Sequence, residues 1–142
     1  MAANAVFLDS SGWVALLNAR DALHGRAYTL WHELVCEGHH FVFTDWIVAE
    51  TANGLARTPA RRRLIESWRQ MQRSPRVRVV FVDSSLMERA LKLYTDRADK
   101  TWGLVDCASF LVMSGEGITE AFTADRHFEQ AGYARLLPVS VE

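Results

Sequence analysis

The stretch AVFLDSSGWVALL at residues 5–17 gives the clearest indication of the architecture, because an aspartate joins a short apolar run to an amphipathic segment. The apolar run at residues 5–8 predicts a buried strand, and residues 11–19 predict a helix. Asp9 stands at the junction between them. A strand followed at once by a helix favours an α/β domain with a mainly parallel sheet.

The rest of the chain repeats this alternation of short apolar runs and longer amphipathic segments. Further strands are predicted at residues 41–44, 77–82, 121–123 and 136–139. Further helices are predicted at residues 22–37, 45–57, 60–73, 84–97, 104–114 and 126–131. Capping chemistry marks several helix starts, namely Asp45, Pro59 and either Ser84 or Ser85. We therefore expect an α/β domain with a mainly parallel sheet of four to five strands.

Length and composition indicate one folded domain covering residues 1–142. The 142 residues suffice for a continuous core, and 49% of them are hydrophobic, with 5 Trp and 7 Phe. No apolar run approaches the roughly 20 residues that cross a bilayer, and MAANAVFLDS lacks the basic start of a signal peptide. We expect a cytoplasmic protein whose two cysteines, Cys36 and Cys107, are buried free thiols.

Charge is unevenly distributed along the chain. The formal net charge of −1 gives no overall attraction to nucleic acid, but residues 57–78 are rich in arginine and contain a single acid, Glu66. The arginines there are Arg57, Arg61, Arg62, Arg63, Arg69, Arg73, Arg76 and Arg78. Three readings stay open for this stretch: contact with an RNA backbone, contact with a protein partner, or a solvated helix face.

Four acids lie in apolar surroundings, where an unpaired carboxylate is costly. Asp9 follows the first predicted strand, and Asp125 lies in AFTADRHFEQAGY after another. Glu50 lies in DWIVAETANGLA and Asp106 in LVDCASFLV, both within predicted helices. Because ligands bind outside the carboxyl ends of parallel strands, these segments can bring all four carboxylates to one edge.

Four carboxylates at one edge predict a divalent metal site. They would repel one another strongly unless a cation neutralised them. Oxygen ligands favour Mg²⁺ or Mn²⁺, and such ions activate water for phosphodiester hydrolysis. Taken singly, each acid has a structural explanation: Asp9 and Asp125 as helix caps, Asp106 as a first-turn acid, and Glu50 on a solvated helix face.

With these residues in place, the chain resembles PIN domains, and more closely the VapC-type toxins of bacterial and archaeal toxin–antitoxin systems. The matching segments are FLDSSGWVALLNARDALH, TDWIVAETANGL, DKTWGLVDCASFLVM and EAFTADRHFEQAGY. Their order and spacing fit nearly the whole chain. The chain departs from close relatives at Val105, where a small hydroxyl residue is usual, and at Thr101, where an acidic or polar residue is common.

The resemblance implies a three-layer α/β/α, Rossmann-like PIN domain. It also implies an endoribonuclease dependent on Mg²⁺ or Mn²⁺, usually a homodimer, whose active-site groove is blocked by a cognate antitoxin. It implies that Asp9, Glu50, Asp106 and Asp125 bind the metal and catalyse. Ser10 and Thr123 correspond to supporting hydroxyls. Arg57, Arg61 and Arg62 are candidate contacts for RNA or antitoxin. None of the five histidines is expected to act in catalysis, and Trp13, Trp46 and Trp102 are expected to pack in the core rather than stack on bases.

Three other functions compete with this prediction. A PIN nuclease of RNA processing would have the same chemistry without an antitoxin. A binding module would keep the fold without cutting, although retention of all four acids argues against it. A small-molecule phosphohydrolase would need a glycine-rich, phosphate-binding loop after the first strand, and DSSGW is not one.

Overall fold

A computed structural model describes residues 4–138, which fold around a five-stranded, entirely parallel sheet. The strands are β1 (Ala5–Leu8), β2 (His40–Thr44), β3 (Val77–Val80), β4 (Glu120–Phe122) and β5 (Ala134–Arg135). Their order across the sheet is β3-β2-β1-β4-β5, so β1 is central. The predicted α/β architecture with a mainly parallel sheet is confirmed.

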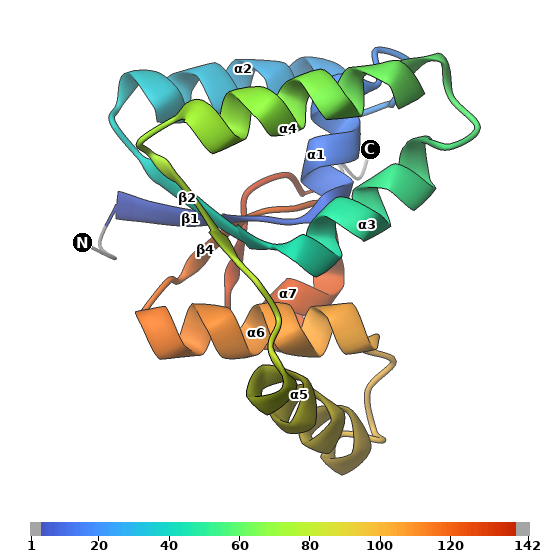
Figure 1. Cartoon of the computed structure of the whole chain (residues 1–142), viewed down its shortest axis with the longest axis vertical. Coiled ribbons are helices and arrows are strands. Elements are labelled where there is room, and N and C mark those ends of the chain that lie inside the picture. Colours follow the sequence, from blue (N-terminus) through green and yellow to red (C-terminus); the bar gives the residue numbers. More distant parts are fainter. Residues whose placement is uncertain (1–3, 139–142) are drawn as a thin grey trace.

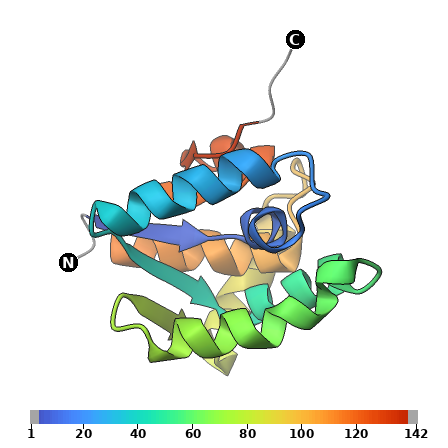
Figure 2. The same ribbon diagram turned by 90° about the horizontal axis from the view of Figure 1, so that it is seen from above.

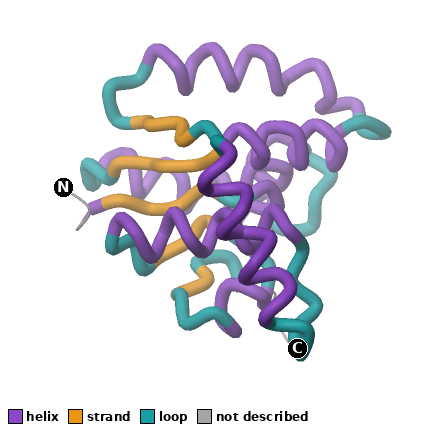
Figure 3. The backbone as a smooth tube through the Cα atoms, turned by 60° about the horizontal axis from the view of Figure 1, so that its bottom comes forward, coloured by secondary structure: helices purple, strands orange, loops and turns teal. Residues whose placement is uncertain are grey.

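Helices cover both faces of the sheet (Figures 1 and 3). They are α1 (Ser10–Leu17), α2 (His24–Cys36), α3 (Asp45–Leu55), the 3₁₀ turn η2 (Pro59–Arg62), α4 (Arg63–Arg73), α5 (Ser84–Asp96), α6 (Leu104–Glu116) and α7 (Arg126–Gln130). In Figure 1, α2 and α4 lie above the strands, and α6 lies below them with α5 outside it. Within residues 4–138, no helix has the length and apolarity needed to span a membrane.

The strand order creates a crevice at one edge of the sheet. The chain runs outward from β1 through β2 to β3, then returns to the other side of β1 to form β4 and β5. The connections that leave β1 and β4 therefore turn toward opposite faces. In open parallel sheets, this switch in strand order is where ligands bind. Asp9 and Asp125 follow the two strands that border it.

The core is rich in aromatic side chains from the central strands and the helices over them. Phe7, Phe43 and Phe122 are fully buried, each contributing about 1.5–3 kcal/mol through removal of apolar surface from water. Trp13 packs edge-on against Phe43 at 5.0 Å, and its indole N–H donates to Ser67 Oγ at 3.0 Å. Trp102 is also buried. Trp13 and Trp102 are therefore core residues, as predicted.

The strand predicted at residues 136–139 is wrong. The final strand is Ala134–Arg135, which begins soon after Gly132 turns the chain with a φ of 98°. Residues 136–138 are not in a strand, and residue 139 lies outside the described residues. The apolar pattern there instead reflects packing, because Leu137 is buried in the core.

Local capping also differs from expectation at two helices. Thr44, not Asp45, caps α3 by accepting from the Ile47 N–H, and Asp45 instead accepts from the backbone N–H of Val82 at 2.8 Å. Asp83, not a serine, caps α5. Pro59 begins a 3₁₀ turn, after which the predicted helix 60–73 becomes α-helical only at residue 63. Cys107 is buried as expected, whereas Cys36 is exposed.

Candidate functional site

Four carboxylates converge at the carboxyl edge of the sheet. Asp9 follows β1 and caps α1, and Asp125 caps α7 after β4. Glu50 lies in the second turn of α3, and Asp106 in the first turn of α6. Each of the four helps to raise the pKa of at least one other, which requires them to be neighbours. Segments far apart in the sequence thus meet at one site.

Asp9 is the most deeply buried of the four acids, with 3% of its surface exposed. Burial raises the pKa of its carboxyl to about 6, and the charges of Glu50 and Asp125 add to the increase. Two hydroxyls oppose this effect by donating to Oδ2: Thr123 at 2.6 Å and Ser11 at 2.9 Å. The site therefore holds this side chain firmly while making its ionised form costly.

Glu50 is half-buried and faces the same centre. The Ser10 hydroxyl donates to its Oε1 at 2.7 Å and so joins α1 to α3. Burial raises the pKa of Glu50, and the charges of Asp106 and Asp125 raise it further. The negative charge of Glu50 is therefore repelled by those of Asp106 and Asp125.

Asp106 and Asp125 face each other across the starts of α6 and α7. Asp106 Oδ2 accepts from the backbone N–H of Gly103 at 3.0 Å and lies 3.1 Å from His127 Nδ1. Asp125 Oδ1 accepts from the backbone N–H of His127 at 2.9 Å. Burial raises the pKa of Asp106, followed by the charges of Asp125 and Asp9.

The four acids share a pattern of hydrogen bonding. In each, one oxygen accepts hydrogen bonds from protein: Oδ2 of Asp9 and Asp106, Oδ1 of Asp125 and Oε1 of Glu50. Within residues 4–138, the second oxygen of each acid receives no hydrogen bond from protein. One oxygen fixes the side chain, and the other remains available to a ligand.

This arrangement fits a divalent cation. The raised pKa values of Asp9, Glu50 and Asp106 show that the protein alone does not compensate their negative charge. A hard cation with oxygen ligands would supply that compensation. Oxygens of Asp106 and Asp125 and a ring nitrogen of His127 also lie within 4.8 Å of one another.

The predicted supporting hydroxyls contact the acids, and sequence reasoning missed two further neighbours. Ser10 donates to Glu50, and Thr123 donates to Asp9 while accepting from the Asp125 N–H at 3.0 Å. Ser11 also contacts Asp9, and His127 contacts Asp106 and Asp125. Both lie two residues after a cap aspartate, a position that does not by itself distinguish them from ordinary residues of a helix start.

The three candidate arginines lie outside this cluster. Arg57, Arg61 and Arg62 are exposed where the chain leaves α3 and passes through η2. Arg61 donates to the carbonyl of Ala56 at 3.3 Å. They follow α3, the helix that carries Glu50, but they contact none of the four acids.

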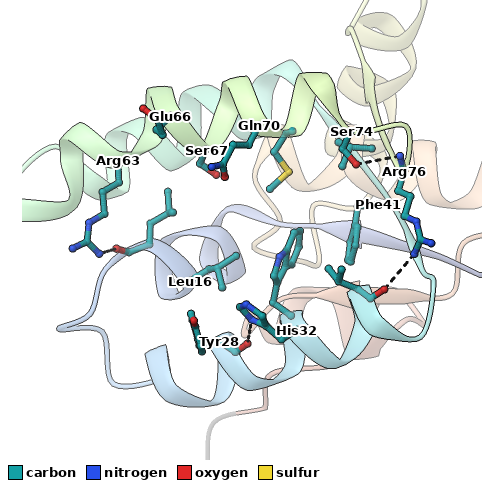
Figure 4. Close-up of a pocket in the computed structure, with 15 residues that line it drawn as sticks. Leu16, Tyr28, His32, Phe41, Arg63, Glu66, Ser67, Gln70, Ser74 and Arg76 are labelled. Carbon is teal, nitrogen blue, oxygen red and sulfur yellow. Dashed lines mark hydrogen bonds between the residues drawn. The ribbon is translucent and has the colours of Figure 1, made fainter.

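One cavity of the described residues lies away from the four acids. It has a volume of about 550 Å³ and lies between α2 and α4, which cover the same face of the sheet and which Figure 2 shows from above. Figure 4 shows side chains from both helices pointing toward each other, with Phe41 at the floor. Arginines stand at both ends: Arg63 donates to the Leu17 carbonyl and Arg76 to the Val35 carbonyl. We call this cavity the α2–α4 groove.

Comparison with known proteins identifies relatives over almost the full length. The family model of the PIN domain matches residues 6–133. The chain is 32% identical over 136 residues to the 23S rRNA-specific endonuclease VapC20 of Mycobacterium tuberculosis, covering 94% of this chain and 98% of the relative. The same match is found for the H37Rv and CDC 1551 strains.

Two solved structures share the fold. The crystal structure of Mycobacterium tuberculosis VapC20, described as a sarcin–ricin-loop-cleaving toxin, superimposes with a TM-score of 0.79 at 31% identity, over 90% of this chain and 95% of that one. FitAcB from Neisseria gonorrhoeae superimposes with a TM-score of 0.62 at 18% identity, over 91% and 94%. The second likeness shows the fold alone.

Proposed function

The chain belongs to the PIN-domain family, and on that premise we propose that it is a toxin-type endoribonuclease that requires Mg²⁺ or Mn²⁺. The carrying observation is that each of the four carboxylates keeps one oxygen without a hydrogen bond from any residue that the structure describes. Its 32% identity to an rRNA endonuclease, across 94% of the chain, supports nuclease activity over a binding role. Residues 1–142 are proposed to form a single PIN domain.

In the proposed mechanism, Asp9, Asp106 and Asp125 would hold the cation, and Glu50 would complete the acidic site beside it. The ion would supply a water of lowered pKa and stabilise charge on the phosphodiester. Glu50 orients the attacking water or accepts its proton. Ser10 and Thr123 hold Glu50 and Asp9 in place through their hydroxyls. The expected products carry a 5′-phosphate and a 3′-hydroxyl.

Ribosomal RNA is the proposed substrate class. The relative VapC20 is named as specific for 23S rRNA, and its crystal structure is described as that of a sarcin–ricin-loop-cleaving toxin. The exposed arginines Arg57, Arg61 and Arg62 are proposed to contact the RNA backbone, because lysine and arginine supply most sequence-independent affinity for phosphate. RNA would approach from the carboxyl edge of the sheet.

A cognate antitoxin is the proposed protein partner. We expect its chain to block the acids, with an apolar segment anchored in the α2–α4 groove. The groove offers Leu16, Val35 and Met71 along its walls, with Arg63 and Arg76 at its ends. An amphipathic segment with acidic residues near its two ends would complement that surface.

A homodimer and a cytoplasmic location complete the proposal. Apolar side chains are exposed on and just before α5, at Phe81, Met87, Leu91 and Tyr94. Residues 87, 91 and 94 recur at helical spacing and so form one face, which suits burial against a second copy.

The test is cleavage of purified ribosomes and of a mixed RNA pool with Mg²⁺, Mn²⁺ or EDTA, comparing wild type with Asp9→Asn. We expect cleavage in rRNA that requires the metal and disappears in the variant. Absence of cleavage in every RNA, from folded protein that binds metal, would contradict the nuclease proposal. Cleavage in EDTA, or by Asp9→Asn, would contradict the metal mechanism.

A further inference from the structure

We infer that His127 is a positioning residue that orders the Asp106–Asp125 pair for metal binding, an inference that rests on the proposed function. Its backbone and its ring act on different acids. The backbone N–H donates to Asp125 Oδ1 at 2.9 Å, and ring Nδ1 lies 3.1 Å from Asp106 Oδ2. One residue thus ties the start of α7 to the start of α6.

The hydrogen-bond partners assign the hydrogen on the ring. Nδ1 faces Asp106 Oδ2 at 3.1 Å and Asp125 Oδ1 at 3.4 Å, and ionised carboxylate oxygens only accept. Nδ1 therefore carries a hydrogen and donates it. Nε2 lies 3.2 Å from the Thr101 hydroxyl, which can donate to it in a neutral ring. Thr101 and Asp106 together fix both the orientation and the tautomer of His127.

The same contacts argue against His127 as a metal ligand, although its distances to Asp106 and Asp125 would permit one. Nδ1 contacts the oxygens that already accept from protein, namely Oδ2 of Asp106 and Oδ1 of Asp125. It is not bonded to the oxygens left for a cation. The ring therefore fixes the protein-bound oxygens, so that the other oxygen of each acid is presented to the metal.

Such partners of ligating carboxylates affect metal affinity strongly, and their loss typically costs about 10–100-fold. The effect has a structural origin here, because Asp106 and Asp125 come from different helices and repel each other. A hydrogen-bond donor beside both acids keeps them together before the cation arrives. Without it, part of the binding energy would be used to draw them together.

The experiment measures Mn²⁺ affinity by titration calorimetry, without RNA, for wild type and His127→Ala, His127→Leu and His127→Asn. Alanine and leucine should weaken binding about 10–100-fold. Asparagine places an N–H donor near the position of Nδ1 and should restore most of the affinity. His32→Ala, which removes an exposed histidine on α2, serves as the matched control and should bind as wild type.

Two results would overturn the inference: wild-type affinity in His127→Ala, or equal weakness in His127→Asn and His127→Ala, as expected for a direct ligand. Nitrogen NMR of the metal-free wild type in mildly alkaline buffer independently shows which ring nitrogen of His127 carries the hydrogen, and we expect Nδ1. A hydrogen found on Nε2 alone would also overturn it. If the wild type binds no Mn²⁺ although the ring carries its hydrogen on Nδ1, that result contradicts the proposed metal site but not the contact between His127 and Asp106.

Discussion

Asp9 is held in an environment that favours its neutral form when no metal is bound. Its pKa rises from the ordinary 3.8 to about 6, first because of burial and then because of Glu50 and Asp125. The folded state therefore binds a proton more tightly than the unfolded chain. Between about pH 4 and pH 6 the metal-free protein should lose stability as pH rises. Above that range, the whole free-energy cost of ionising Asp9 in the folded protein is present.

We predict that Asp9→Asn stabilises the metal-free protein at neutral pH. A pKa raised from 3.8 to about 6 corresponds to about 3 kcal/mol at 1.36 kcal/mol per pH unit. Asparagine avoids this cost and can still accept from Thr123 through its carbonyl oxygen. Urea denaturation with EDTA at several pH values measures the difference, which should shrink toward zero near pH 4. Equal stability of both proteins at neutral pH would contradict the prediction.

Individual residues of the site differ in how far the sequence could predict them. Asp9 and Asp125 were visible because each comes within three residues of the end of an apolar run that forms a strand. Ser11 and His127 were not, because serine and histidine near a helix start have many ordinary roles. Their contacts depend on how closely β1 and β4 lie together, and spacing along the chain does not give that distance. Whether the acids bind metal stays a prediction.

At the scale of elements, α1 packs unusually close to β4. A methyl group added at Gly12 would lie 2.2 Å from the carbonyl oxygen of Phe122 and 2.4 Å from its ring. The obstacle includes backbone, which cannot rotate away. Gly12 therefore allows the helix capped by Asp9 to approach the end of the strand that precedes Asp125.

We predict that Gly12→Ala destabilises the protein by about 3 kcal/mol, the upper end of the range for overpacked cores. Gly115→Ala is the matched control, since Gly115 is exposed in α6 and an added methyl would meet nothing within 4 Å. That change should stabilise the protein by about 0.5–1 kcal/mol through helix propensity. Chemical denaturation measures both. A neutral Gly12→Ala would show that α1 can move away from β4 at little cost.

The α2–α4 groove gives a second prediction at this scale. Val35 is 41% exposed and lines the groove, whereas Ile65 is 52% exposed on α4 and does not line it. Val35→Glu should weaken capture of a co-expressed antitoxin at least about tenfold, because it replaces an apolar contact of the groove with a charge. Ile65→Glu adds the same charge at comparable exposure and should leave capture unchanged. Equal effects of the two changes would place the antitoxin elsewhere.

Most elements could be predicted from apolar periodicity, and the exceptions have local causes. The helices around Glu50 and Asp106 stand out because long amphipathic segments follow turn residues. The last strand could not be located, because residues 136 and 137 are apolar for packing whereas Ala134 and Arg135 make the strand pairs. Pairing of a two-residue strand depends on its neighbour β4, not on its own sequence.

For the whole molecule, parallel topology sets the arginines of residues 57–78 at different distances from the four acids. All strands end at the edge that holds the four acids. Helix α4 connects β2 to β3 and so runs back toward the opposite edge. Arg61 and Arg62 precede this helix, near the edge of the acids, whereas Arg69 and Arg73 lie along its later turns. Although the formal net charge is −1, Arg61 and Arg62 therefore provide positive charge near the edge of the acids.

We predict that Arg61→Gln with Arg62→Gln weakens RNA binding and lowers its salt dependence. Each lost phosphate contact should reduce the slope of log affinity against log salt by about 0.7 for single-stranded RNA. Binding is measured in the Asp9→Asn background, so that the RNA stays intact. The control pair, Arg69→Gln with Arg73→Gln, removes the same charge farther along α4 and should keep more of the affinity and slope. Equal losses in both pairs would mean that RNA responds to total charge and not to arginines at the edge of the acids.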